Sequence, residues 1–178
     1  TEHFKGLDNI KIRVFDEKDM IKNNMGAIYG VGRGSQRPPR MMVVEYMGGA
    51  KGDAPVAVVG KGITFDTGGI SIKGSSNMWN MKFDLATLTG SVGRALGKDY
   101  AGLFTRNDDL VAPFISMGKL TGEELWQLPL NENHFKAIEN NVADVMNSGP
   151  DAPGASAGAA FLATFVRETT TWIHLDIA

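Results

Sequence analysis

The spacing of apolar side chains in the first third of the chain predicts a helix. Asp16 is a typical helix N-cap residue, and Asp19 stands at the third helical position, where its carboxylate completes a capping box. Apolar residues follow at roughly helical spacing, namely Met20, Ile21, Met25 and Ile28. We therefore expect a short helix from about Glu17 to Tyr29.

The pattern then changes from helical spacing to apolar runs separated by turn residues. Glycines within 30–34, followed by Pro38 and Pro39, predict a break in regular structure. Met41–Met47 has the pattern of a buried strand, and Val56–Val59 that of a second strand. The second strand leads into a stretch punctuated by glycines, and residues in that position are well placed for chemistry.

The second half of the chain alternates between helical and strand patterns. Helices are expected at Leu88–Leu96, at His134–Val145 and at Ala155–Val166, and the last is rich in small residues that allow close packing. A strand is expected at Trp172–Ile177. Strands alternating with helices are typical of an α/β sheet, and no repeat suggests a second domain. We therefore predict one α/β domain across residues 1–178.

Composition excludes several classes of protein. The chain has 178 residues, 43% apolar and 21% charged, as in a globular domain. Its net charge of −2 creates no global field for nucleic acid or an anionic membrane. Because cysteine is absent, any metal must bind to oxygen or nitrogen. No apolar run is long enough for a membrane span, and residues 1–15 lack a signal-peptide core, so we expect a cytoplasmic protein.

The densest group of candidate functional residues lies in a glycine-rich stretch after the second expected strand. It contains Lys61, Asp66 and Lys73. Each alone is more simply a solvated lysine or a turn-forming aspartate. Together they suit a divalent cation or an anionic transition state, because glycines let backbone approach a bound group and carboxylate oxygen is a hard ligand. A lysine binds metal only as the neutral amine, which a second nearby cation favours.

Another carboxylate and a block with hydroxyl groups follow. Asp84 could share one or two metal ions with Asp66, and the simpler alternative is that it caps a helix. The block Leu85–Gly90 offers hydroxyls and small residues. Its pattern fits either the end of a strand that leads into a helix or the floor of a pocket.

Several familiar motifs are absent from the sequence. The GxSxG pattern GASAG at 154–158 falls at the start of the helix expected at Ala155–Val166 and does not follow a predicted strand, as a nucleophile elbow would, and no P-loop ending follows the glycines at 30–34. The histidines are far apart, without HExxH spacing: His3, His134 and His174. A basic cluster is more simply a solvated loop than a phosphate contact: Arg33, Arg37 and Arg40. Thermolysin-like, serine-hydrolase and nucleotide-binding functions are therefore not favoured.

Five blocks of sequence stand out, in order, along nearly the whole chain. They are VGKGITFDTGGISIK at 59–73, NMKFD at 80–84, LATLTG at 85–90, ELWQLPL at 124–130 and WIHLDIA at 172–178. In this succession they resemble the catalytic domain of the leucyl aminopeptidase family. The resemblance implies an α/β domain with a central mixed sheet flanked by helices, a homohexamer and a cytoplasmic metallo-exopeptidase.

The resemblance also assigns roles to individual residues. It makes Lys61, Asp66 and Asp84 metal ligands, with Asp66 bridging two divalent ions, and it makes Lys73 catalytic. The ions would be zinc, with manganese or magnesium exchanging at one site, and they would bind the free amino terminus of a peptide and activate a bridging water. Lys73 would stabilise the oxyanion of the tetrahedral intermediate.

Three further residues match the family's pocket for the first side chain of the substrate: Met81, Thr87 and Gly90. That pocket favours leucine and similar apolar residues. Because the site binds the free amine, the resemblance implies an aminopeptidase that releases N-terminal residues, preferably leucine, from peptides.

The sequence departs from the family between Asp84 and Leu85. The family has several dozen residues there, including the motif NTDAEGRL, which supplies an aspartate and a glutamate to the metals and an arginine that holds a bicarbonate. In the family, one aspartate ends the MKFD block and a second aspartate commonly precedes LATLTG. Asp84 occupies both of these places in the sequence, so it could correspond to either one. Since the family's separate N-terminal domain is also absent and the family continues past Ala178, we expect a partial catalytic domain.

Two explanations of this internal gap compete. Either the natural protein carries the segment, or the molecule is truly deleted. The first is favoured, because deletion would remove strands and helices from a packed sheet at a cost above the roughly 5–15 kcal/mol of stability that a domain possesses. An active aminopeptidase is therefore the first hypothesis. A non-catalytic, truncated relative that acts as an oligomeric scaffold is the second, and nucleic-acid binding is the weakest.

Overall fold

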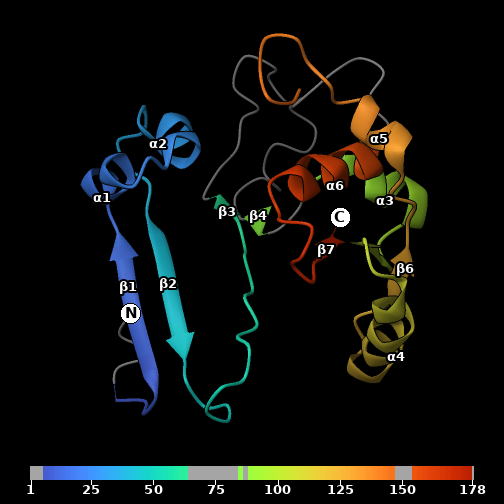
Figure 1. The fold of residues 1–178 in the computed structure, drawn as a ribbon, viewed down its shortest axis with the longest axis horizontal. Coiled ribbons are helices and arrows are strands. Elements are labelled where there is room, and N and C mark those ends of the chain that lie inside the picture. Colours follow the sequence, from blue (N-terminus) through green and yellow to red (C-terminus); the bar gives the residue numbers. More distant parts are fainter. Residues whose placement is uncertain (1–5, 64–83, 86–87, 147–153, 178) are drawn as a thin grey trace. The chain divides into compact units, whose positions relative to one another are not determined.

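The computed structural model describes residues 6–63, 84–85, 88–146 and 154–177 (Figure 1). The chain divides into two compact units, one up to Ala57 and one from Val58 onward. Each unit has its own helices and strands, and the expectation of one domain across the chain stays a prediction. No helix in the described ranges is both long and apolar enough to cross a membrane.

The first unit is a two-stranded antiparallel ribbon with two helices in its connection. β1 (Ile10–Phe15) pairs with β2 (Met41–Tyr46), with Ile10 opposite Tyr46 and Phe15 opposite Met41. β2 confirms the strand expected at 41–47, whereas β1 was not among the predicted elements. The expected burial of β2 is wrong, because Val44 and Tyr46 are 39% and 70% exposed.

A capping box begins the first helix, α1 (Glu17–Lys22), as predicted. The Asp19 amide donates to the Asp16 carboxylate at 3.0 Å, and the Asp16 amide donates to the Asp19 carboxylate at 3.2 Å. The first of these bonds lowers the pKa of Asp16, because it stabilises the ionised form. The predicted helix does not continue to Tyr29. Asn24 takes a left-handed φ of 56°, which ends one helix before α2 (Gly26–Gly32) begins.

The glycines at 30–34 do not all break regular structure, contrary to the prediction. Gly30 and Gly32 lie inside α2. A Cβ on Gly32 would come within 2.6 Å of the Pro39 ring. The lack of a side chain at Gly32 therefore lets the proline-containing segment return closely against the helix.

The second unit contains a mixed sheet with strand order β6-β5-β7. β5 (Ala101–Thr105) pairs in parallel with β6 (Leu125–Gln127) and antiparallel with β7 (Ile173–Asp176). Leu103 and Phe104 of β5 are fully buried, so the central strand also supplies the centre of the core. β7 confirms the strand expected at 172–177, whereas β5 and β6 were not among the predicted elements.

Helices flank this sheet, which confirms the predicted α/β class with a mixed sheet. α3 (Gly90–Leu96) and α6 (Gly154–Thr164) both contact β5. α4 (Val111–Thr121) follows the short 3-10 helix Asp108–Leu110 and contacts β6. α3 and α6 agree with predicted helices, whereas α4 was not predicted.

Small side chains allow α6 to pack closely, as its composition predicted. Its buried residues are all alanines: Ala157, Ala159, Ala160 and Ala163. Ala157 and Ala160 form an apolar cluster with Ile138, and Phe135 and Phe161 pack against it. The aromatic rings fill the space that the short alanine side chains leave on this face of the helix.

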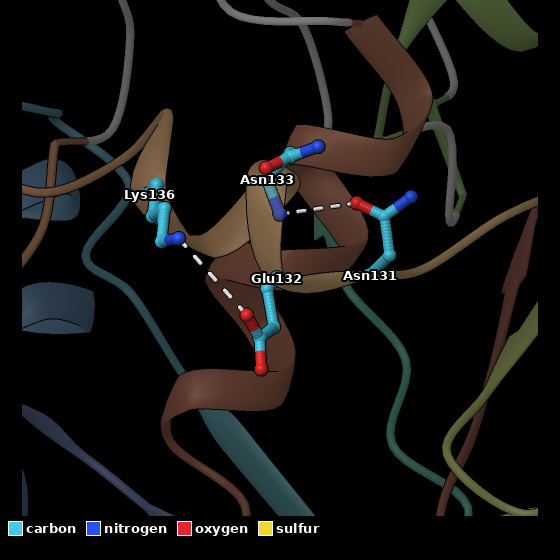
Figure 2. Close-up of polar contacts among 4 residues, drawn as sticks. All are labelled: Asn131, Glu132, Asn133 and Lys136. Carbon is cyan, nitrogen blue, oxygen red and sulfur yellow. Dashed lines mark hydrogen bonds and ion pairs between the residues drawn. The ribbon is translucent and has the colours of Figure 1, made fainter.

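The helix predicted at 134–145 is much shorter, and α5 covers only Glu132–Lys136 (Figure 2). Asn131 caps it by accepting a hydrogen bond from the Asn133 amide at 3.1 Å. The ion pair between Glu132 and Lys136 spans 4.0 Å between exposed side chains, so it contributes little. Beyond the helix, the Asn140 side chain accepts hydrogen bonds from the amides of residues 142 and 143, and this side-chain turn replaces the helical pattern.

The apolar run Val56–Val59 does not form the strand predicted for it. Val56, Val58 and Val59 are 91%, 93% and 93% exposed, and no described strand pairs with this run. A strand needs a neighbour that satisfies its backbone hydrogen bonds. The apolar pattern identifies a segment suited to burial in a sheet, but it does not supply the neighbour.

His174 in β7 lies among aromatic rings. Its ring stacks on Phe104 and Trp172, with ring centroids 5.7 Å and 6.3 Å away. Its Nε2 is buried with no hydrogen-bond partner in the described part of the chain. Burial lowers the pKa of His174, because the charged imidazolium loses solvation, and the nearby Asp176 opposes this shift. The folded protein therefore favours neutral His174.

We predict that the protein loses stability as the pH falls below about 6.5, and that His174→Phe removes much of this loss. The unfolded chain protonates His174 near its ordinary pKa, whereas the folded protein protonates it only at lower pH. Between these two values the unfolded state binds more protons and is favoured. Urea unfolding at about pH 7.5 and about pH 5.5 measures the effect. His134→Gln is the control and should lose as much stability at the lower pH as the wild type does. If His174→Phe also loses as much stability as the wild type, the prediction is contradicted.

Candidate active site

Two of the predicted metal ligands lie on or beside neighbouring strands. β3 (Gly62–Ile63) pairs antiparallel with β4 (Asp84–Leu85), with Ile63 opposite Asp84. Lys61 directly precedes β3. Adjacent strands lie roughly 4.8 Å apart, so this pairing brings together backbone segments that are distant in sequence. The simpler reading of Asp84 as a helix cap is wrong, because Asp84 lies in a strand.

The structure describes some of the predicted site residues and not others. Lys61 is exposed, and Gly90 is the first residue of α3. The remaining predicted site residues lie outside the described part of the chain: Asp66, Lys73, Met81 and Thr87. The roles assigned to these residues therefore stay predictions.

The block at 85–90 leads from a strand into a helix, which is one of the two structures that its pattern fits. Leu85 ends β4, and Gly90 begins α3. Just before Gly90, the amides of Leu88 and Thr89 each donate to Oδ1 of Asp176 at 3.2 Å, and the Thr89 hydroxyl donates to Oδ2 at 2.5 Å. One carboxylate at the end of β7 thus holds the segment that enters α3.

Asp176 was not among the predicted site residues, although it belongs to the last of the five family blocks. Its side chain is fully buried. A carboxylate in a short strand that also contains two large apolar residues is a signal that could have identified it, because such a group is buried only where other groups pair with it or donate hydrogen bonds to it.

Helix α6 packs against the same segment through its glycines. A Cβ on Gly158 would come within 2.8 Å of Cγ2 of Thr89 and 3.2 Å of Cδ2 of Leu88. A Cβ on Gly154 would come within 2.5 Å of the Ser91 hydroxyl. The start of α3 is therefore in contact with α6 and is hydrogen-bonded to β7.

The two predicted ligands that lie on or beside the paired strands β3 and β4 carry donor groups that fit a divalent cation in kind. Asp84 carries carboxylate oxygens, and Lys61 carries a nitrogen that binds metal when it is neutral. Across the described ranges, no three His, Asp or Glu residues form a group that could hold a metal ion. A complete site therefore requires further donors, of which Asp66 is the predicted one.

Solved structures define the class of protein to which this fold belongs. The chain resembles a mutant of tomato leucine aminopeptidase with a TM-score of 0.78 and 25% identity, over 96% of this chain and 49% of the tomato protein. It also shares the fold of the bottromycin maturation enzyme BotP, solved in complex with Mn, with a TM-score of 0.84 and 22% identity over 94% of this chain and 55% of BotP. The fold is that of an aminopeptidase catalytic domain.

Sequence comparison then gives the family. The profile described as "cytosol aminopeptidase family, catalytic domain" matches residues 1–86 and 83–178, so the chain belongs to this family. A probable cytosol aminopeptidase of Brucella anthropi is 34% identical, over 95% of this chain and 51% of that protein. The chain thus spans about half the length of the curated relatives it matches.

The same matches agree with the gap predicted beside Asp84. The two pieces of the family match meet at residues 83–86. The alignment with the Brucella protein extends over 253 positions, which exceeds the 178 residues of the whole chain. Relatives therefore carry internal residues that this chain lacks.

We predict that Gly158→Ala lowers the free energy of unfolding by about 1 kcal/mol, although alanine is the better helix former. The added methyl group meets Thr89, which cannot move away without breaking its hydrogen bond to Asp176. Gly26→Ala is the matched control, because a Cβ there meets no described atom within 4 Å and should not destabilise. Urea unfolding measures both variants, and an unchanged or raised stability of Gly158→Ala would contradict the close packing.

Proposed function

We propose that the chain is the catalytic part of a metal-dependent aminopeptidase that releases N-terminal residues, preferably leucine, from peptides. The observation that carries this proposal is the family match over both parts of the chain. The pairing of β3 with β4 supports it, because the metal site proposed here requires Lys61 and Asp84 to approach one another.

In this proposal Lys61, Asp66 and Asp84 hold two divalent ions. Bound there, the ions would supply Lewis acidity and lower the pKa of a coordinated water, so that a nucleophile forms at neutral pH. Zinc, manganese or magnesium fits the nitrogen and oxygen donors, and the manganese in the related fold of BotP supports a divalent ion. Lys61 must lose its proton to act as a ligand.

The remaining residues would bind the substrate and stabilise charge. Lys73 would donate a hydrogen bond to the oxyanion that develops when the peptide bond is attacked. Met81, Thr87 and Gly90 would line the pocket for the first side chain and favour leucine, as the tomato leucine aminopeptidase fold supports. The free amino terminus of the peptide would bind to the ions, which restricts the enzyme to the end of the chain.

The names of the relatives also support a proposal for the cellular setting. The relatives carry the name cytosol aminopeptidase, which supports a cytoplasmic location for this protein. We further propose a homohexamer as the working assembly, and a bicarbonate as the general base if the natural protein carries the segment that the chain lacks beside Asp84. Peptides with a free amino terminus are the proposed substrates.

A second candidate function is a non-catalytic scaffold. It is favoured by the internal gap, because the relatives carry residues between the two matched pieces and this chain does not. A folded, oligomeric protein that hydrolyses no aminoacyl amide would favour this alternative.

We expect the purified protein to hydrolyse leucine amide when supplied with zinc or manganese and to lose this activity in EDTA. Asp84→Asn should lower kcat/KM by about 100-fold or more, because it removes a charged ligand while preserving size. Asp99→Asn, which neutralises an exposed carboxylate, is the control and should keep full activity. Full activity of Asp84→Asn would show that Asp84 is not a ligand, and an inactive wild type would refute the aminopeptidase function.

Gly90→Ala tests the proposed pocket separately from the fold. A Cβ on Gly90 meets no described atom within 4 Å, so the variant should be at least as stable as the wild type. If Gly90 lines the pocket, the added methyl group should lower kcat/KM for leucine amide by about tenfold. A Cβ on Gly34 likewise meets no described atom within 4 Å, so Gly34→Ala should leave activity unchanged. A stable Gly90→Ala variant with unchanged kinetics would place Gly90 outside the pocket.

A further inference from the structure

The Asp176 carboxylate is a buried group with an unusual set of partners. Its side chain has no exposed surface, and its described hydrogen bonds go to a single short segment of chain. Both oxygens are used, with Oδ1 accepting from the amides of Leu88 and Thr89 and Oδ2 accepting from the Thr89 hydroxyl. Hydrogen bonds to a carboxylate are stronger than those between neutral groups, so they fix this backbone firmly.

The fixed segment leads directly into the proposed substrate pocket. Gly90 is the next residue after Thr89, and a Cβ placed on it would meet open space among the described residues. The Leu88 side chain is 39% exposed, although its amide is bound to Asp176. The buried Asp176 carboxylate therefore holds the backbone of this segment, whereas Gly90 and the Leu88 side chain are accessible to solvent.

α6 restrains the same segment. Gly158 lies so close to Thr89 that no side chain fits between them. The hydroxyl of Thr89 is bound to Asp176, and its methyl group contacts the backbone side of α6. Both branches of the Thr89 side chain, the hydroxyl and the methyl group, are thus restrained. Its rotation about χ1 is also restricted because the side chain is β-branched.

We infer that Asp176 is a positioning residue for substrate selection. By binding Leu88 and Thr89, it holds the backbone that places Gly90 at the wall of the pocket for the first side chain. This assignment rests on the proposed aminopeptidase function. Asp176 itself does not touch the reacting atoms, and its effect is transmitted through Thr89 and the entry to α3.

A positioning role differs measurably from a role in stability alone. If a variant only lowers stability, a fraction of its molecules is unfolded and inactive. The apparent kcat/KM then falls by the same factor for every substrate. A variant that displaces the pocket wall changes kcat/KM for leucine amide more than for alanine amide, because only the larger side chain fills the pocket. The ratio of the two kcat/KM values does not depend on the fraction of folded enzyme.

The test is to measure the ratio of kcat/KM for leucine amide to kcat/KM for alanine amide in a series of variants of the metal-loaded protein. Thr89→Val removes the hydroxyl and keeps the branched shape, and Asp176→Asn keeps the size of the acceptor and removes its charge. Each should lower the preference for leucine amide by about threefold or more. Thr89→Ser keeps the hydroxyl that binds Asp176, so it should keep the preference within about twofold.

Thr105→Val is the matched control. Thr105 is 7% exposed and donates a hydrogen bond to the Trp172 carbonyl at 2.8 Å, so the variant also loses a hydroxyl hydrogen bond in the same sheet, at the opposite end of the β5–β7 pairing from Asp176. Thr105→Val should lower the free energy of unfolding and leave the ratio of the two kcat/KM values unchanged.

Three outcomes would overturn the assignment. An active wild type whose ratio is unchanged in both Thr89→Val and Asp176→Asn would refute the positioning role and leave the aminopeptidase function intact. An equal shift of the ratio in Thr105→Val would mean that any loss of stability alters selection, which also refutes it. A wild type that hydrolyses neither amide would refute the proposed function, and the assignment with it.

Discussion

The second unit depends on hydrogen bonds between the last strand and the segment that enters α3. A buried carboxylate is tolerated only where donors replace the water it has lost, and Leu88 and Thr89 supply these donors to Asp176. The partners are 87 and 88 residues apart in the chain, so the bonds form only once the sheet has brought β7 beside the start of α3. The location of Gly90, and of any pocket it borders, follows from this contact.

β7 combines this polar contact with an apolar one. His174 and Asp176 are two residues apart in an extended strand, and the strand between β7 and β6 is β5, whose Phe104 stacks on His174. The neutral imidazole that this burial favours keeps the apolar core free of a cation, whereas the carboxylate two residues later is satisfied by backbone amides. The same short strand therefore supports the core and holds the entry to α3.

Exposed apolar segments lie on both sides of the boundary between the two units. The valines at 56–59 and one face of β2 are apolar but exposed, and no described strand pairs with the run at 56–59. The family match breaks at 83–86, beside β4, and relatives carry additional residues at this internal position. The short β3–β4 pair joins backbone from before this break to backbone beside it, with Ile63 opposite Asp84.

Local chemistry in the sequence determined the elements whose signals are contained within a few residues. The capping box of Asp16 and Asp19, the alanines of α6 and the apolar pattern of β2 and β7 were all readable, because each depends on neighbours in the chain. The motifs around Lys61 and Asp84 likewise indicated the family. Tertiary structure alone decided what depends on distant partners. It gave the run at 56–59 no partner among the described strands, ended α5 at Lys136 where the Asn140 turn competes, and paired Asp176 with Leu88 and Thr89. A pattern along the chain records which side chains seek burial or hydrogen bonds, but the folded chain determines which partners reach them.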